Sequence, residues 1–232
     1  MKRLPISAAL LALAACAQPA APKGEAPAAP AGPVQPVATD VPAGRYTLDK
    51  AHASLVFRVD HIGFSQYTGR FETWDATLDL DPANPSASRV SATIDPRSLG
   101  IPAPPAGFLN DLKGPQWLDT AQFPQMSFRS TSVEMIAANA AHITGELTFR
   151  GVTKPVTLEA TFNGGYAGHP MDPNARIGFS AHGALKRSEF GLSLGVPPPG
   201  STMGVGDEVA FAIEAEFNGP AWTPPPATQE QK

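Results

Sequence analysis

The sequence predicts an all-β domain whose strands either close into an up-and-down antiparallel barrel or pack as a two-layer sandwich. Segments with alternating apolar and polar residues recur throughout residues 45–219, and a period of two is typical of strands with one covered face. About eight such segments are separated mostly by turns and loops rich in Gly, Pro and Asp. Only residues 99–123 interrupt this rhythm, with apolar residues at roughly helical spacing, which predicts one or two short helices across one end of the sheet.

The clearest alternation lies between residues 142 and 162 and predicts a β-hairpin. Apolar or small residues occupy every second position from Ile143 to Phe149 and from Val156 to Phe162, and polar residues lie between them. Residues 151–155 form the expected turn. One face of such a hairpin must be covered by more of the chain, and the other meets water.

The remaining strands follow from the same pattern. A change of parity between Phe71 and Trp74 predicts a bulge, because one extra residue moves the apolar set to the other side of a strand. Long Gly- and Pro-rich loops are expected at 164–175 and 187–206. The other expected strands include residues 46–48, 53–61, 67–71, 74–80, 90–94, 126–128, 177–185 and 209–217.

The two termini are predicted to lie outside the folded domain. Residues 1–15 have two basic residues followed by a short apolar run, which is typical of a secretory signal and too short to span a membrane. Leu13-Ala14-Ala15-Cys16 resembles the lipobox of bacterial lipoproteins, which implies that Cys16 is lipidated. The Ala- and Pro-rich stretch 16–44 is expected to be a semi-rigid tether, and 220–232 a disordered tail.

Composition argues against several classes of function. The formal charge is −4, and removal of residues 1–15 leaves 15 basic against 21 acidic residues. Basic residues are scattered singly, so nothing indicates nucleic-acid binding. Cys16 is the single cysteine, and an intrachain disulfide is therefore impossible.

Motifs for catalysis or metal binding lack the context that they need. The five histidines show no spacing typical of a zinc site. The pattern Gly-x-Ser-x-Gly occurs at residues 191–195, but it lies in an expected Gly- and Pro-rich loop and not between a strand and a helix, as a nucleophile elbow requires. The glycine-rich stretch 200–206 lacks the strand and helix context of a phosphate loop. We therefore expect no metal, no required cofactor, no catalytic residues and no enzyme activity.

Several fragments, in this order and spacing, resemble the YceI-like family of bacterial extracytoplasmic proteins. The resemblance covers Tyr46 to Phe217 and implies an extended lipocalin-like barrel that binds polyisoprenoid lipids inside. The fragments are Tyr46-Thr47-Leu48-Asp49 with His52, Phe57-Arg58-Val59-Asp60-His61, Gly69-Arg70-Phe71, Phe123-Pro124 with Phe128, Gly145-Glu146-Leu147-Thr148, Arg150-Gly151-Val152-Thr153-Lys154-Pro155, Arg187-Ser188-Glu189-Phe190-Gly191 and Val205-Gly206-Asp207-Glu208-Val209.

The strand parities then give a set of residues expected to contact the isoprenoid. His61 lies at a strand end, where it is either a contact for the lipid head group or a hydrogen-bonded structural residue. Arg187, beside Phe190, either pairs with a pyrophosphate or anchors its loop through carbonyls or Asp207. The expected wall residues are Leu55, Phe57, Val59, Phe71, Phe128, Leu147, Phe149, Phe179 and Leu185, with Phe108, Leu112 and Trp117 near the mouth.

The leading functional hypothesis is a lipid-anchored envelope protein that holds a long isoprenoid, such as a quinone or a polyprenyl phosphate, for carriage, storage or stress protection. Its partners would be the isoprenoid and, through Cys16, a membrane on the periplasmic side. Ala17 after the cysteine implies the outer membrane. The alternatives are a packed barrel that acts through protein partners and an isoprenoid-modifying enzyme. Whether the protein forms a homodimer is left open.

Overall fold

A computed structural model describes residues 34–223, which form one ten-stranded antiparallel sheet. The elements are β1 (Gly44–His61), β2 (Ser65–Phe71), β3 (Trp74–Leu80), η1 (Pro85–Ala87), β4 (Arg89–Ile94), η2 (Pro96–Ser98), β5 (Leu99–Gly100), α1 (Phe108–Lys113), β6 (Met126–Ala137), β7 (Ala140–Phe149), β8 (Val152–Tyr166), β9 (Asn174–Lys186), η3 (Arg187–Phe190) and β10 (Val205–Ala221).

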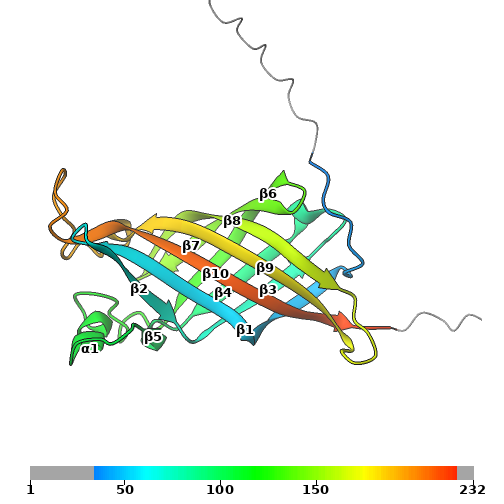
Figure 1. Ribbon diagram of the computed structural model, residues 1–232, viewed down its shortest axis with the longest axis horizontal. Helices are drawn as coiled ribbons and strands as arrows, with labels where there is room; N and C mark the ends of the chain where they lie inside the picture. Colours follow the sequence, from blue (N-terminus) through cyan, green and yellow to red (C-terminus); the bar gives the residue numbers. More distant parts are fainter. Residues whose placement is uncertain (1–33, 224–232) are drawn as a thin grey trace, which may run out of the picture. The chain divides into compact units, whose positions relative to one another are not determined.

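The sheet closes into a barrel because its last strand pairs with its first. β10 and β1 are antiparallel from Thr47↔Asn218 to His61↔Val205. The order β1, β3, β4, β6, β7, β8, β9, β10 makes a ring of eight strands, while β2 and β5 extend beside the C-terminal half of β1 (Figure 1). The predicted barrel is therefore confirmed and the sandwich alternative is wrong. Closure also leaves no exposed edge on the ring.

The predicted hairpin is formed by β7 and β8, but its turn is shorter than expected. Phe149 pairs with Val152, so only Arg150 and Gly151 make the turn. Both have positive φ, 48° and 73°, as a type I′ hairpin turn requires. Pro155 lies inside β8 opposite Glu146, where β8 pairs with β7 alone, since pairing with β9 begins at Leu158. A proline is tolerated at such a margin of a strand.

The apolar residues do change parity between Phe71 and Trp74, as predicted. The cause is a break between two strands and not a bulge within one strand. β2 ends at Phe71 and β3 begins at Trp74. Only the last residues of β3 pair with β1, at Gly44 to Thr47, whereas β2 pairs with Val56 to His61. The two strands thus share one neighbour, and a short break between them lets Phe71 and Trp74 face the same side.

The end of the barrel where β1 begins is covered by residues 34–43, which we call the N-terminal segment. The backbone N–H of Val37 donates to the carbonyl of Ala138 at 2.9 Å, and Val41 is only 3% exposed. The hydroxyl of Tyr46 donates to the carbonyl of Pro42 at 2.7 Å, and burial raises the Tyr46 pKa to about 12. The predicted tether is therefore wrong for these residues, because they pack against the barrel.

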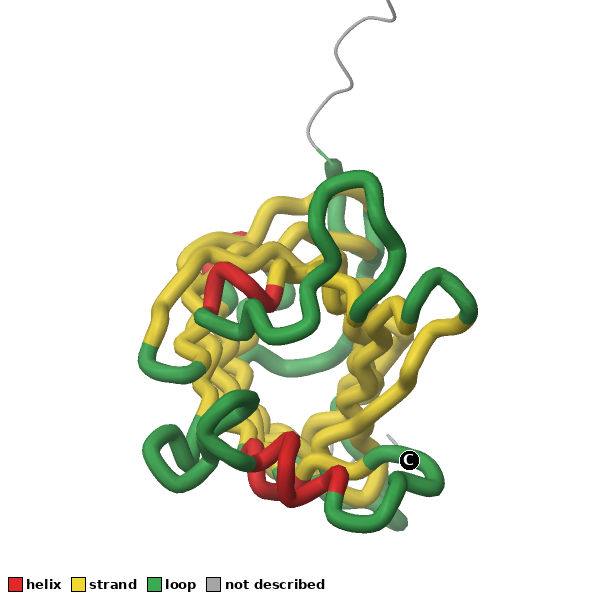
Figure 2. Tube along the Cα trace, turned by 90° about the vertical axis from the view of Figure 1, so that its left-hand side faces the viewer, coloured by secondary structure: helices red, strands yellow, loops and turns green. Residues whose placement is uncertain are grey.

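The opposite end, which we call the α1 end, carries α1, η3 and the turns between β1 and β2 and between β7 and β8 (Figure 1). Seen from this end, the strands form a closed ring, with α1 at its rim (Figure 2). β10 extends to Ala221, slightly beyond the predicted boundary at 219. Residues 1–33, including the signal and Cys16, and the tail from 224 lie outside the described residues. Within 34–223, no helix is long and apolar enough to cross a membrane.

Buried side chains form two clusters and not one continuous core. One cluster, around Tyr46, Leu78 and Phe217, lies toward the N-terminal segment. The other, around Phe128, Phe149 and Phe190, lies toward the α1 end. Many inward-facing residues around these clusters, such as Leu55 and Leu147, are only partly buried. Their free surface faces the inside of the barrel.

Candidate ligand-binding cavity

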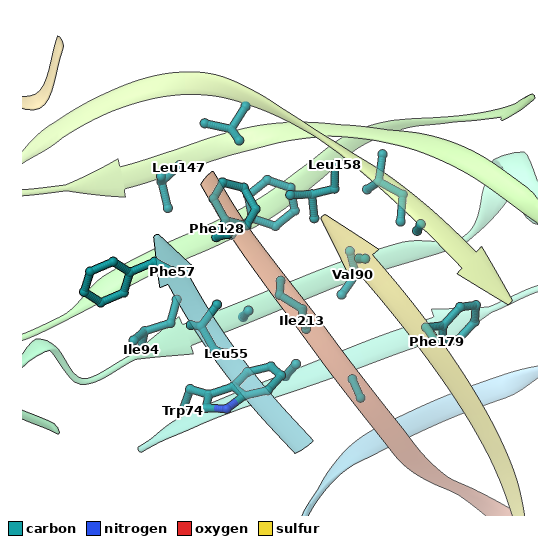
Figure 3. Close-up of a pocket in the computed structure, with 18 of the residues that line it drawn as sticks. Leu55, Phe57, Trp74, Val90, Ile94, Phe128, Leu147, Leu158, Phe179 and Ile213 are labelled. Carbon is teal, nitrogen blue, oxygen red and sulfur yellow. The ribbon is translucent and has the colours of Figure 1, made fainter. Parts of the chain in front are cut away.

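The barrel encloses a cavity of about 970 Å³. This volume is at the upper end of the roughly 300–1,000 Å³ typical of small-molecule sites. Side chains from both sides of the ring point into it, among them Leu55 and Phe57 of β1, Phe128 of β6 and Ile213 of β10 (Figure 3). The cavity extends from the α1 end to the N-terminal segment, because Phe108 and Val37 both contribute to its wall.

The structure brings nearly all of the predicted contact residues together on this wall. From the ring these are Leu55, Phe57, Val59, His61, Phe128, Leu147, Phe149, Phe179 and Leu185, from β2 Phe71, and from the α1 end Phe108, Leu112, Trp117 and Arg187. They come from five strands and the α1 end. Their common position follows from strand parity, which places every second residue of each strand on the inner face.

Phe190 is the exception among the predicted residues. It is 1% exposed and does not reach the cavity. Its ring packs against Phe149, with centroids 5.5 Å apart, in the buried cluster behind the wall. The predicted contact of Phe190 with a ligand is therefore corrected. It supports the wall from outside because η3 turns the chain away from the lumen after β9.

Three inward-facing glycines keep the cavity open. Gly69, Gly145 and Gly183 lie beneath the rings of Phe57, Phe128 and Phe211, respectively. A Cβ at Gly69 would be 2.7 Å from Cε1 of Phe57, and a Cβ at Gly183 would be 2.7 Å from Cζ of Phe211. Without these Cβ atoms, the aromatic rings lie across the neighbouring strand and not straight across the lumen.

Gly69→Ala should narrow the cavity and weaken ligand binding. The new methyl group meets only side chains, Phe57 and Ile101, so the Phe57 ring must move toward the lumen. Overpacking of this kind costs roughly 1–3 kcal/mol of stability. Gly178→Ala is the matched control, because a Cβ there has its nearest neighbour at 3.9 Å. Thermal unfolding and ligand titration check both variants. Unchanged binding in Gly69→Ala would show that the Phe57 ring does not limit the lumen.

Polar groups line the cavity only near its two ends. His61, Tyr67 and Arg187 lie at the α1 end, and Thr39, Ser88, Arg89 and Asn139 lie at the other. Between them the wall consists of aliphatic and aromatic side chains, with the indole of Trp74 as its one polar edge (Figure 3). This arrangement fits a long apolar molecule with a polar group at one end.

The rim at the α1 end is aromatic. The ring of His61 lies 6.1 Å from that of Tyr67, and the Tyr67 ring lies 6.4 Å from that of Phe108 in an edge-to-face arrangement. His61 is exposed, and none of residues 34–223 forms a hydrogen bond with its ring. The structural alternative predicted for His61 therefore has no support here, and its ring is free to meet a ligand.

Arg187 is a structural anchor at this end. It is 4% exposed, and its guanidinium donates to the carbonyls of Gly206, Leu192, Leu194 and Val205 at 2.7 to 2.9 Å. It also lies over the Trp117 ring, 5.6 Å from the centroid. Burial lowers its pKa. Of the two predicted roles, loop anchoring through carbonyls is the one that this geometry fits, because most of the N–H groups are already used.

Comparison with known proteins places this barrel in a family. The family model described as YceI-like domain matches residues 46–217, and the protein YceI of Salmonella arizonae is 39% identical over 160 residues, which cover 67% of this chain and 80% of that protein. The chain belongs to the YceI family. The resemblance found in the sequence is thereby confirmed.

Solved structures agree with the YceI assignment. A Campylobacter jejuni YceI protein aligns with a TM-score of 0.58 at 32% identity, over 75% of this chain and 98% of that one. A Saccharophagus degradans protein described as a polyisoprenoid binding domain aligns with a TM-score of 0.55 over the same shares of the two chains. Its identity is 14%, so this second likeness concerns the fold alone.

The YceI cavity also contains residues that the predicted contact list omitted. Trp74, Val90 and Ile94 were on predicted apolar strand faces, and the same parity argument would have included them. Tyr67 has the parity of Phe71 and would have been included as well; it reaches the rim because β2 folds back along β1. Pro36, Val37 and Thr39 also line the cavity. Nothing in the sequence indicated this, because an Ala- and Pro-rich segment is not typical of residues that pack against a domain.

The outer surface of the YceI barrel carries one cluster that resembles a metal site. Asp49, His52 and Glu216 each offer one atom that could bind a metal ion, and these three atoms lie within 4.8 Å of one another. Arg176 already donates to Asp49 at 2.9 Å and lies 3.8 Å from Glu216. Hydrogen bonds from His52 and Arg176 lower the Asp49 pKa to about 2. The guanidinium therefore supplies the positive charge that a metal ion would otherwise bring, and this cluster fits an ion-pair network.

Proposed function

We propose that this YceI-family protein binds one long-chain isoprenoid inside its barrel and holds it without chemical conversion. The observation that carries the proposal is the cavity, whose wall is apolar along its length and polar only at its ends. A polyprenyl chain fills such a space with methyl-branched hydrocarbon, and its quinone or phosphate head group stays at the rim beside His61 and Tyr67. The Saccharophagus degradans neighbour, which shares the fold, is described as a polyisoprenoid binding domain, so a barrel of this fold can hold such a ligand.

The alternative of a barrel that is simply packed is disfavoured by the volume of the cavity. At about 30 Å³ per molecule, a space of 970 Å³ would hold roughly thirty waters. Waters in the middle would have almost no polar partners on the wall, and buried water needs two to four. An apolar occupant removes that cost and covers the partly buried rings of Phe57 and Phe179.

The composition of the wall favours carriage over catalysis. Among the described residues that line the cavity, none is Asp, Glu, Lys or Cys. His61 and Tyr67 are the groups near the lumen that could move a proton, and no carboxylate on the wall orients either of them. General acid–base chemistry depends on such positioned pairs.

The proposal places the protein on the periplasmic side of the bacterial envelope, attached to a membrane through Cys16. Support comes from residues 1–15 and from the position of the single cysteine directly after Leu13-Ala14-Ala15. Ala17 after the cysteine favours the outer membrane over the inner one.

Cys16→Ser should release the protein from the membrane fraction into the soluble periplasmic fraction, because no other cysteine can carry an acyl chain. Fractionation and immunoblotting measure this, and Ser193→Ala, a change at an exposed site far along the sequence from Cys16, is the control. A Cys16→Ser protein that remains with the membrane would contradict the anchor.

Ligand binding is tested by titration with a long-chain quinone, whose ring quenches nearby tryptophans. Trp74 and Trp117 lie on the cavity wall, whereas Trp222 lies beside Gly168 near the other end of the barrel. We expect saturable quenching that Trp222→Phe leaves intact and that Trp74→Phe with Trp117→Phe removes.

The same titration separates the competing functions. A quinone without its prenyl tail should bind on the order of a thousandfold more weakly, because each buried CH₂ contributes about 0.8 kcal/mol. Absence of binding would support a barrel that acts through protein partners. A quinone recovered with an altered mass would support an isoprenoid-modifying enzyme.

A further inference from the structure

Two loops at the α1 end present exposed apolar side chains to solvent. Phe64 lies in the turn between β1 and β2 and is 83% exposed. Met203 and Leu194, in the loop between η3 and β10, are 74% and 46% exposed. We call these three residues the mouth tips. Large apolar side chains in such positions, when grouped, mark interaction sites.

The mouth tips belong to one surface because the two loops are hydrogen-bonded together. The N–H of Ile62 in the first loop donates to the carbonyl of Gly204 in the second at 2.8 Å. The second loop is itself closed by the N–H of Val205, which donates to the carbonyl of Gly195 at 2.8 Å. Gly63 packs against Thr202, which would lie 3.2 Å from a Cβ at position 63. Both loops project past the strands at the same end of the barrel (Figure 1).

These loops are also free of charged side chains over their whole length. Residues 61–69 and 190–206 contain no Asp, Glu, Lys or Arg. At the opposite end Met171 is even more exposed, at 92%. Its neighbour Asp172, however, pairs with Arg176 and accepts a hydrogen bond from Tyr166. Val34, Val37 and Ile136 at that end also lie in uncharged segments, but they are only 37 to 42% exposed. The α1 end therefore presents the more exposed apolar side chains on uncharged loops.

The mouth tips continue the apolar surface of the cavity outward. His61, Tyr67 and Val205 line the cavity, and Phe64 and Met203 lie within a few residues of them along the chain. Along the chain, Phe64 and Met203 therefore follow directly on residues of the cavity wall and its rim.

We propose that the mouth tips insert into a lipid bilayer, so that a prenyl chain passes between membrane and cavity without crossing water. The ligand class rests on the proposed function, whereas the membrane contact itself does not. A bilayer suits these residues better than a protein partner does. They project on two loops that carry no charged side chains, and such side chains are what would orient a protein partner. A fluid acyl region accepts such projections without a complementary shape.

Membrane insertion is tested with an environment-sensitive fluorophore on single cysteines in the processed chain, residues 16–232, carrying Cys16→Ser. Met203→Cys places the label on a mouth tip, and Met171→Cys places it on an exposed methionine at the opposite end. With vesicles of phosphatidylethanolamine and phosphatidylglycerol, we expect a blue shift at position 203 and quenching by nitroxide groups on the acyl chains. The label at position 171 should stay in water.

Transfer is measured with unlabelled protein in the same background. Phe64→Ser combined with Met203→Ser should slow uptake of a long-chain quinone from vesicles at least tenfold and leave the amount bound at equilibrium unchanged. Met171→Ser should alter neither.

The outcomes separate this proposal from the proposed function. A label at position 203 that stays unquenched, or one quenched no more than that at 171, overturns the proposal and leaves the mouth tips to a protein partner. If neither the parent protein nor any variant takes up quinone, the proposed ligand class is rejected. Insertion of the label at position 203 would still establish membrane contact in that case.

Discussion

Leu147→Lys should yield a folded barrel that no longer carries lipid. Leu147 is on β7 and points into the cavity (Figure 3). It is only partly buried, so an ammonium group there can meet water that enters an emptied lumen. In a packed core the same change would bury an unpaired charge at a cost of several kcal/mol, which is comparable with the roughly 5–15 kcal/mol that stabilises a whole domain.

Thr148→Lys is the control, since Thr148 faces outward and its hydroxyl hydrogen-bonds that of Thr153 across the hairpin at 2.8 Å. Loss of this exposed bond should cost no more than about 1 kcal/mol and leave lipid binding intact. Circular dichroism and lipid co-purification measure both variants. An unfolded Leu147→Lys protein would contradict an open lumen at this depth, and a folded one that retains lipid would contradict the inward position of residue 147.

Arg187→Met should destabilise the protein by on the order of 3–5 kcal/mol. Removal of the guanidinium leaves the carbonyls of Leu192, Leu194, Val205 and Gly206 without their donor, and buried polar groups left unpaired are costly. Arg187→Lys should recover only part of this, because an ammonium cannot reproduce the planar fork. Urea unfolding measures the free energy of each variant.

Arg70→Met is the matched control for Arg187, because the Arg70 pair with Glu72 is exposed on both sides and such pairs contribute at most about 1 kcal/mol. From the most to the least stable, the expected order of the variants is Arg70→Met, Arg187→Lys and Arg187→Met. A stable Arg187→Met protein that loses affinity only for phosphate-bearing isoprenoids would assign Arg187 to the head group and contradict its role as an anchor.

The strand pattern was sufficient to predict the barrel wall, because one side of a closed sheet must be apolar and period-two alternation reports that side directly. His142 to Phe162 illustrate this, as do Leu55 and Phe57 opposite Arg58. The ring closure between β1 and β10 could not be derived in this way, since alternation says nothing about which strands pair. It followed from the family resemblance.

Side-chain roles away from regular strands were the least predictable. Phe190 was expected to contact the ligand beside Arg187, yet η3 places it behind the lumen. Arg187 has the chemistry of a phosphate ligand, and only the positions of four carbonyls assign it to the loop. The N-terminal segment looked like part of a tether because its composition resembles a linker, whereas Val41 packs in one buried cluster with Tyr46 and Ile177.

The size of the lumen was likewise beyond sequence reasoning. Apolar inward residues are equally consistent with a packed core and with a cavity. The difference depends on how the rings of Phe57, Phe128 and Phe211 lie across glycines on neighbouring strands, which is a property of register and not of composition.

The most direct test of the central claim is a native mass spectrum of the protein isolated gently from membranes of its host. The cavity predicts a stoichiometric adduct that dissociates on denaturation and is identified as an isoprenoid, and that is absent from Leu147→Lys and present in Thr148→Lys. A spectrum that shows only the polypeptide and its covalent anchor, even after incubation with extracted membrane lipids, would contradict a lipid-binding barrel.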